Sequence, residues 1–124
     1  MNVINNSINR ISYLIDEIPV RIKSVKAEIL SKKPAPDKWS KKEILGHLCD
    51  SAVNNLSRFI RAQFEPEPFK VIPYAQNEWV ELNNYQKMDI EAILVYWVTL
   101  NKQIVHIVSN ISEAKLGVVC NLGN

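Results

Sequence analysis

Five polar residues able to bind ligands or transfer protons lie close together in one short segment: His47, Asp50, Ser51, Asn54 and Arg58. In a helix, successive residues are rotated by about 100°, so these side chains would fall on one side, next to the apolar residues of the same helix. A polar strip at the edge of a helical core is a place where a pocket can form between facing helices. We therefore take this strip as the candidate site.

The strip contains groups suited to metal binding. The imidazole of His47 is a suitable ligand for zinc or nickel, and Asp50, three residues further along, could orient it by a hydrogen bond. Asn54 and Arg58 would then line the pocket. The alternative is a histidine at the edge of the core with ordinary surface neighbours. Because one histidine cannot form a metal site, the spacing by itself favours that alternative.

The remaining chemically notable residues suggest no second site. His106 lies on the opposite side of its predicted helix from Trp97 and should therefore face outward. Trp39, Trp79 and Trp97 are interpreted as packing residues. The sequence has no Ser/His/Asp order, no glycine-rich phosphate loop and no His-x-x-x-His pair. The residues alone thus indicate a helical domain with one polar pocket.

Two amphipathic segments precede and carry the candidate site. Isoleucines and valines in alternating steps of four and three predict one helical stripe through residues 3–31, which Pro19 should kink or restart. Ser40 and Glu43 have the spacing of a capping box, and they predict that the second helix spans residues 40–64.

A third long helix is predicted over residues 89–111, with Asp89 as its N-cap and Asn101 as the polar exception in its apolar stripe. Residues 74–88 indicate a short helix or turn. No segment shows sustained two-residue alternation, so the predicted class is all-α. Three apolar stripes leave a bundle open, and a fourth helix or self-association should close it. The predicted shared core comprises Ile15, Ile44, Leu48, Phe59, Leu94, Trp97 and Ile104.

Composition narrows the class of protein. The 124 residues are enough for one domain, and a net charge of +2 does not suggest a nucleic-acid partner. The lysines of residues 32–42 are interpreted as a solvated connection, with an anion contact as the alternative. The longest apolar run, residues 92–98, is too short for a membrane span, and residues 1–20 do not resemble a signal peptide. Two well-separated cysteines fit free thiols in a reducing compartment. We therefore expect a cytoplasmic protein with no membrane partner.

The stretch WSKKEILGHLCDS at residues 39–51, followed by Arg58 and Phe59, resembles the segment that opens the second helix of the DinB/YfiT-like superfamily. Tyr74, Tyr85 and residues 96–101 are similar to later segments of that family. The resemblance extends over roughly residues 10–120.

The resemblance implies a DinB-like four-helix bundle, with residues 1–124 as a single, C-terminally incomplete domain that contains only the first three long helices. It also implies a homodimer and a divalent metal, nickel or zinc, held by three histidines, with His47 at the first ligand position. The other two family ligands form a His-x-x-x-His pattern on a fourth helix. This sequence has no such pattern, so we expect that helix to be missing and the metal not to be fully coordinated in this chain.

The implied function is that of a metal-dependent hydrolase or a low-molecular-weight-thiol transferase acting on a small electrophilic substrate. His47 would be a metal ligand, and Asp50, Asn54 and Arg58 would be the catalytic-site residues. The alternative is a non-catalytic helical dimer whose pocket is vestigial or binds a small molecule. The residues alone do not decide between the two.

Overall fold

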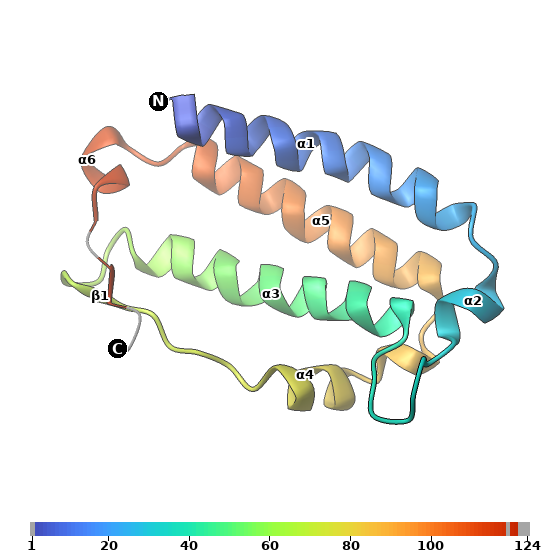
Figure 1. The fold of residues 1–124 in the computed structure, drawn as a ribbon. Coiled ribbons are helices and arrows are strands. Elements are labelled where there is room, and N and C mark those ends of the chain that lie inside the picture. Colours follow the sequence, from blue (N-terminus) through green and yellow to red (C-terminus); the bar gives the residue numbers. More distant parts are fainter. Residues whose placement is uncertain (1, 119, 122–124) are drawn as a thin grey trace.

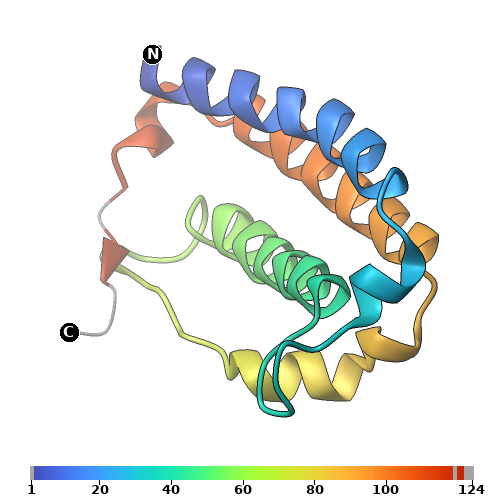
Figure 2. The same cartoon turned by 45° about the vertical axis from the view of Figure 1, so that its right-hand side comes forward.

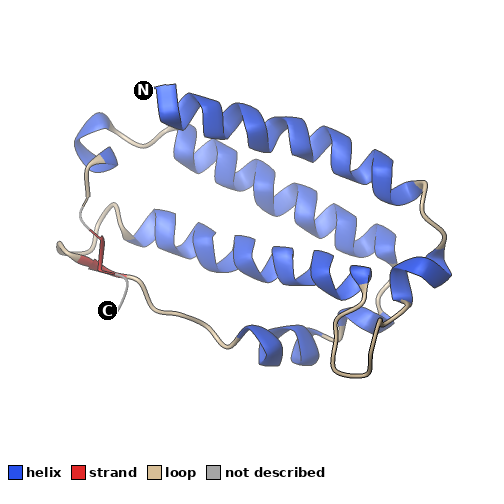
Figure 3. Ribbon diagram, viewed as in Figure 1, coloured by secondary structure: helices blue, strands red, loops and turns tan. Residues whose placement is uncertain are grey.

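The computed structural model describes residues 2–118 and 120–121, in which three long helices run side by side (Figures 1 and 3). The predicted all-α class is confirmed, with one small addition: two strands of two residues pair in parallel, placing Phe69 opposite Cys120. In chain order the elements are α1 (Asn2–Lys23), α2 (Ala27–Ser31), α3 (Lys41–Arg61), β1 (Phe69–Lys70), α4 (Gln76–Asn83), the 3-10 helix η1 (Tyr85–Lys87), α5 (Ile90–Ser109), α6 (Glu113–Leu116) and β2 (Cys120–Asn121).

The first helical stripe is interrupted later than predicted. α1 continues through Pro19 to Lys23, and the chain restarts as α2 only after residues 24–26. At the break, the Ser24 hydroxyl donates to the carbonyl of Arg21 at 2.6 Å. A hydroxyl that satisfies a carbonyl at a helix end favours termination there, so the polar residue stops the helix where the proline did not.

The capping box that opens α3 is confirmed. The Ser40 hydroxyl accepts from the Glu43 amide at 3.1 Å, and the Glu43 carboxylate accepts from the Ser40 amide at 3.1 Å. α3 ends at Arg61, one turn before the predicted residue 64. The helix that carries the candidate site therefore has a sharply defined start.

The core is centred on α5, which packs against both α1 and α3. Figure 2 shows α3 between the α1–α5 pair and α4, so that α3 is covered on two sides. Four predicted core residues are buried: Ile15, Leu94, Trp97 and Ile104. The central cluster consists of Leu45, Cys49, Val80, Tyr85, Ile93, Leu94 and Trp97.

The core prediction is wrong for part of α3. Ile44 is 46% exposed and Leu48 is 45% exposed, and Phe59 is half-buried. α3 instead buries Leu45 and Cys49, because these residues lie on the edge of its broad apolar arc that belongs to the central cluster. The sequence pattern identifies the arc but not which of its edges the neighbouring helices cover.

Among the described residues, one helix, α5, is long and apolar enough by length and composition to cross a membrane. The same helix contacts both α1 and α3, and four of its side chains are buried in the core.

Candidate functional site

His47 lies half-buried on α3, and its Nδ1 atom is buried without a hydrogen-bond partner among the described residues. The Trp39 ring packs against the imidazole, with 4.8 Å between the ring centroids and a tilt of 34°. Trp39 directly precedes Ser40, so the capping box that starts α3 also holds this indole near the helix. The result is an imidazole with a fixed neighbour and an available ring nitrogen.

Asp50 is almost completely buried, at 1% exposure, and it faces α4 and η1. Its Oδ1 atom accepts from the Tyr85 hydroxyl at 2.6 Å and from the Asn83 side-chain amide at 3.0 Å. Its Oδ2 atom has no partner in the part of the chain that the structure describes. None of the hydrogen bonds among the described residues joins this carboxylate to His47. The predicted orienting hydrogen bond is therefore not made in this structure.

Burial sets the electrostatics around Asp50. It raises the pKa of the Asp50 carboxyl, and the Tyr85 hydrogen bond and the nearby His47 partly oppose that rise. The neighbouring Cys49 thiol is fully buried, and burial together with the Asp50 charge raises its pKa to about 12. Cys49 is thus an inert core thiol at neutral pH.

Gly46 allows Tyr85 to reach Asp50. A Cβ atom at position 46 would overlap the Tyr85 ring, so only glycine leaves room for this ring against α3. The sequence pattern alone does not predict this contact between Gly46, Asn83, Tyr85 and Asp50. The sequence does contain one indication of this close contact. Gly46 lies inside a helix, where glycine costs about 1 kcal/mol relative to alanine and usually has a packing reason.

The other predicted site residues bind backbone groups or the connection after α3. The Asn54 amide donates to the carbonyl of Asp50 at 2.8 Å, within the helix. Arg58 donates to the carbonyl of Ile72 at 2.8 Å, and thereby ties α3 to the connection that follows it. Ser51 shares a 2.8 Å hydrogen bond with the hydroxyl of Tyr74 in the same connection.

The residues on this strip supply only part of a metal site. The Nδ1 atom of His47 suits one ligand position, whereas His106 is exposed on α5, as the sequence predicted. In the part of the chain that the structure describes, no group of three His, Cys, Asp or Glu side chains could hold a metal. A catalytic zinc site uses three protein ligands, so these residues do not by themselves fit a complete metal centre.

Comparisons with known proteins show what the whole chain is similar to. A scan of protein-family models finds no match. The chain is 27% identical over 114 residues to a "putative metal-dependent hydrolase" of Bacillus mycoides (strain KBAB4), and the match covers 92% of this chain. It is 28% identical over 105 residues to a protein of the same description from Bacillus cereus (strain AH820), where the match covers 85%. The chain spans 65% and 60% of the lengths of these two relatives.

A similar structure is that of YfiT from Bacillus subtilis, described as "a probable metal-dependent hydrolase with an unusual four-helix bundle topology". The TM-score is 0.74 at 18% sequence identity, and the match covers 94% of this chain and 68% of YfiT. The resemblance first noted in residues 39–51 thus extends to the arrangement of the helices. The chain has a YfiT-like, all-α fold.

Proposed function

We propose that this chain forms the greater part of a metal-dependent hydrolase and that His47 is one of its metal ligands. The two Bacillus relatives are described as putative metal-dependent hydrolases and YfiT as a probable one, and this chain shares the fold of YfiT. The observation that supports the proposal most directly is the buried Nδ1 atom of His47, which has no partner among the described residues.

A buried nitrogen without a partner is energetically costly. Leaving such a group unsatisfied costs about 1–3 kcal/mol, and binding a cation at Nδ1 would remove that cost. The packed Trp39 ring restricts rotation of the imidazole, which favours ligand binding because less freedom is lost. The further ligands of a complete centre would have to come from outside the part of the chain that the structure describes.

The proposal assigns different roles to the other polar residues of the strip. Asp50 would hold α4 and η1 against α3 and place a carboxylate beside the centre. Asn54 and Arg58 would form the pocket wall next to the connection after α3. The metal would be nickel or zinc, both of which accept imidazole ligands, and the substrate a small electrophilic molecule.

Metal analysis of the intact native protein tests this assignment. Elemental analysis and calorimetry should show tight nickel or zinc binding, which His47→Ala abolishes because it removes a ligand. His106→Ala is the matched control and should leave binding unchanged, since His106 is exposed on another helix. Full metal occupancy in a folded His47→Ala protein would refute the assignment.

Two alternative functions can be tested in the same preparation. Transfer of a low-molecular-weight thiol onto an electrophile would differ from hydrolysis by its requirement for the added thiol and by a thioether product. A non-catalytic helical dimer would bind a small molecule at the pocket and turn over neither substrate class. We favour hydrolysis because it is the activity in the relatives' names.

We further propose that the protein is a cytoplasmic homodimer that binds a small-molecule substrate rather than nucleic acid or a membrane. The near-neutral charge, with 15 basic and 13 acidic residues, supports the absence of a nucleic-acid partner. The apolar side chains left exposed on α3, Ile44 and Leu48, support self-association.

A further inference from the structure

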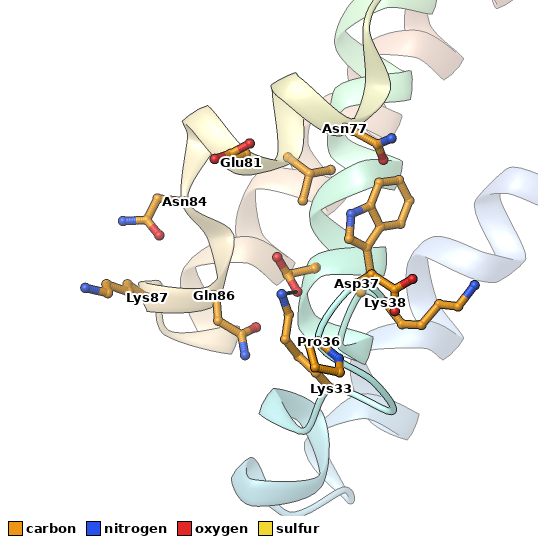
Figure 4. A pocket seen from close by; sticks show the side chains of 12 residues that line it. Lys33, Pro36, Asp37, Lys38, Asn77, Glu81, Asn84, Gln86 and Lys87 are labelled. Atoms are coloured by element: carbon orange, nitrogen blue, oxygen red, sulfur yellow. Dashed lines mark ion pairs between the residues drawn. The ribbon is translucent and has the colours of Figure 1, made fainter.

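A cavity of about 500 Å³ lies between the connection of residues 32–39 and the α4–η1 segment (Figure 4). Its volume is within the range of small-molecule sites. The half-buried Trp39 supplies apolar surface, Val80 lies behind it at 1% exposure, and Asn77 on α4 lines the opposite wall. None of the polar residues of the candidate strip on α3 lines this cavity.

A hydrogen-bond network fixes the base of the cavity. The side chain of Gln86 accepts from the Ser40 hydroxyl at 2.6 Å and donates to the carbonyl of Ser31 at 2.7 Å. The Lys42 ammonium donates to the main-chain carbonyl of Gln86 at 3.2 Å. One residue therefore connects η1 to the end of α2 and the start of α3, so the two walls of the cavity are held together without a ligand.

Charged residues of both signs line the cavity and come from both walls. Lys33 reaches in from the connection that forms one wall, and Glu81 lies on α4 across from it (Figure 4). Lys33 pairs with the buried carboxylate of Glu43 at 3.4 Å, while its own side chain remains 40% exposed. The charged lining residues are Lys33, Lys38, Lys87, Asp37, Glu43 and Glu81.

Charges of opposite sign lie on the two walls, with Lys33 on the connection and Glu81 on α4, so a ligand of a single sign would be attracted by one wall only. A ligand with both signs would gain at each wall. We propose that the cavity binds a small zwitterion that carries a carboxylate and an ammonium group, the charge pattern of a free amino acid or a short peptide. The carboxylate lies toward Lys33, the ammonium toward Glu81, and an apolar side chain contacts Trp39.

This inference goes beyond the proposed hydrolase function and does not need a metal. Trp39 is the structural link between the two sites, because it lines the cavity and also packs on His47. Binding measured in the presence of EDTA therefore tests the cavity separately from the metal assignment.

The experiment is a calorimetric titration of the protein in EDTA with phenylalanine, with the dipeptide glycylphenylalanine and with two single-charge analogues. The analogues are 3-phenylpropionate, which has no ammonium group, and phenethylamine, which has no carboxylate. At least one zwitterion should bind about tenfold more tightly than either analogue, since each analogue loses one charge-assisted contact. The indole N–H signal of Trp39 should shift in NMR spectra on binding. The relative affinities of phenylalanine and the dipeptide distinguish a free amino acid from a peptide ligand.

Matched variants locate the binding. Glu81→Gln and Lys33→Gln should each weaken zwitterion binding by about tenfold. Glu78→Gln, on the same helix, and Lys32→Gln, on the same connection, make the same charge changes outside the cavity lining and should leave binding unchanged. Should Lys33→Gln fail to fold because Glu43 loses its partner, the exposed Glu81 still tests the site. Zwitterions that bind no better than the single-charge analogues, or equal affinity for Glu81→Gln and wild type, would overturn the proposal.

Discussion

The buried carboxylate of Asp50 shows how one residue can hold two elements together at an electrostatic cost. Its Oδ1 atom satisfies donors from Tyr85 and Asn83, whereas Oδ2 is buried without a partner among the described residues. Burial favours the neutral acid, and the pKa of Asp50 is accordingly raised above its ordinary value. The hydrogen bonds stabilise the fold, but the charge does not.

The sign of the resulting pH dependence follows from proton binding. Between the ordinary pKa of an aspartate, about 3.9, and the raised pKa in the folded state, the folded protein binds more protons than the unfolded chain. The contribution of Asp50 to the free energy of unfolding is therefore largest at low pH and falls as the pH rises through this interval.

Substituting Asp50→Asn should remove this contribution while keeping an oxygen that accepts from Tyr85 and Asn83. Above about pH 4 the wild type should lose stability relative to the variant, so the free energy of unfolding of the variant minus that of wild type should rise, by no more than about 1.4 kcal/mol per pH unit. Above the raised pKa of Asp50 in the folded state, this difference should become constant. Urea unfolding across a pH series measures this difference. A difference that falls with pH would show that the folded state favours the Asp50 charge.

At the scale of elements, the start of α3 organises the site. Ser40 accepts from the Glu43 amide and donates to Gln86, so one hydroxyl both caps α3 and attaches η1 to it. Trp39, one residue earlier, contacts His47 and lines the cavity. The position of both sites therefore depends on how this helix begins.

Replacing Ser40 with alanine removes the cap of α3 and leaves the Gln86 oxygen without its donor. Loss of such a cap should lower the free energy of unfolding by about 1 kcal/mol or more. The control is Ser112→Ala at the start of α6, where the structure shows no side-chain capping bond within the described chain. That change should stay within about 0.5 kcal/mol of wild type. Urea unfolding measures both variants, and equal effects would contradict a special role for the α3 cap.

At the scale of the whole molecule, the helices cover the apolar surface unevenly. α5 contacts both α1 and α3, and α4 covers a further side of α3, but Ile44 and Leu48 remain exposed. Apolar surface of this kind on a small domain is commonly covered by another chain or segment. The proposed homodimer would reduce this exposure.

Light scattering during size-exclusion chromatography should give a mass near twice that of a single chain. Dilution should shift the equilibrium toward the monomer, because association depends on protein concentration. A circular dichroism spectrum recorded on the same fractions checks that the helical fold is intact. A helical protein that remains monomeric at high concentration would contradict the dimer.

The amino-acid sequence by itself determined the features that depend on neighbouring residues. The capping box of α3, the three long helices and the all-α class follow from local hydrogen bonding and from apolar spacing along one helix. The outward position of His106 and the burial of Leu94 and Trp97 follow from the same periodicity. The Trp39–Ser51 stretch also carried enough of a family pattern to indicate the fold.

Only the tertiary structure decided which partners the polar residues have. Tyr85 and Asn83 engage Asp50 from a segment far along the chain, and Gly46 makes room for that contact. The same packing left Leu48 exposed although it lies on the apolar arc of α3. Helical periodicity describes one helix at a time, whereas burial and hydrogen bonding depend on the neighbouring helix that covers each side.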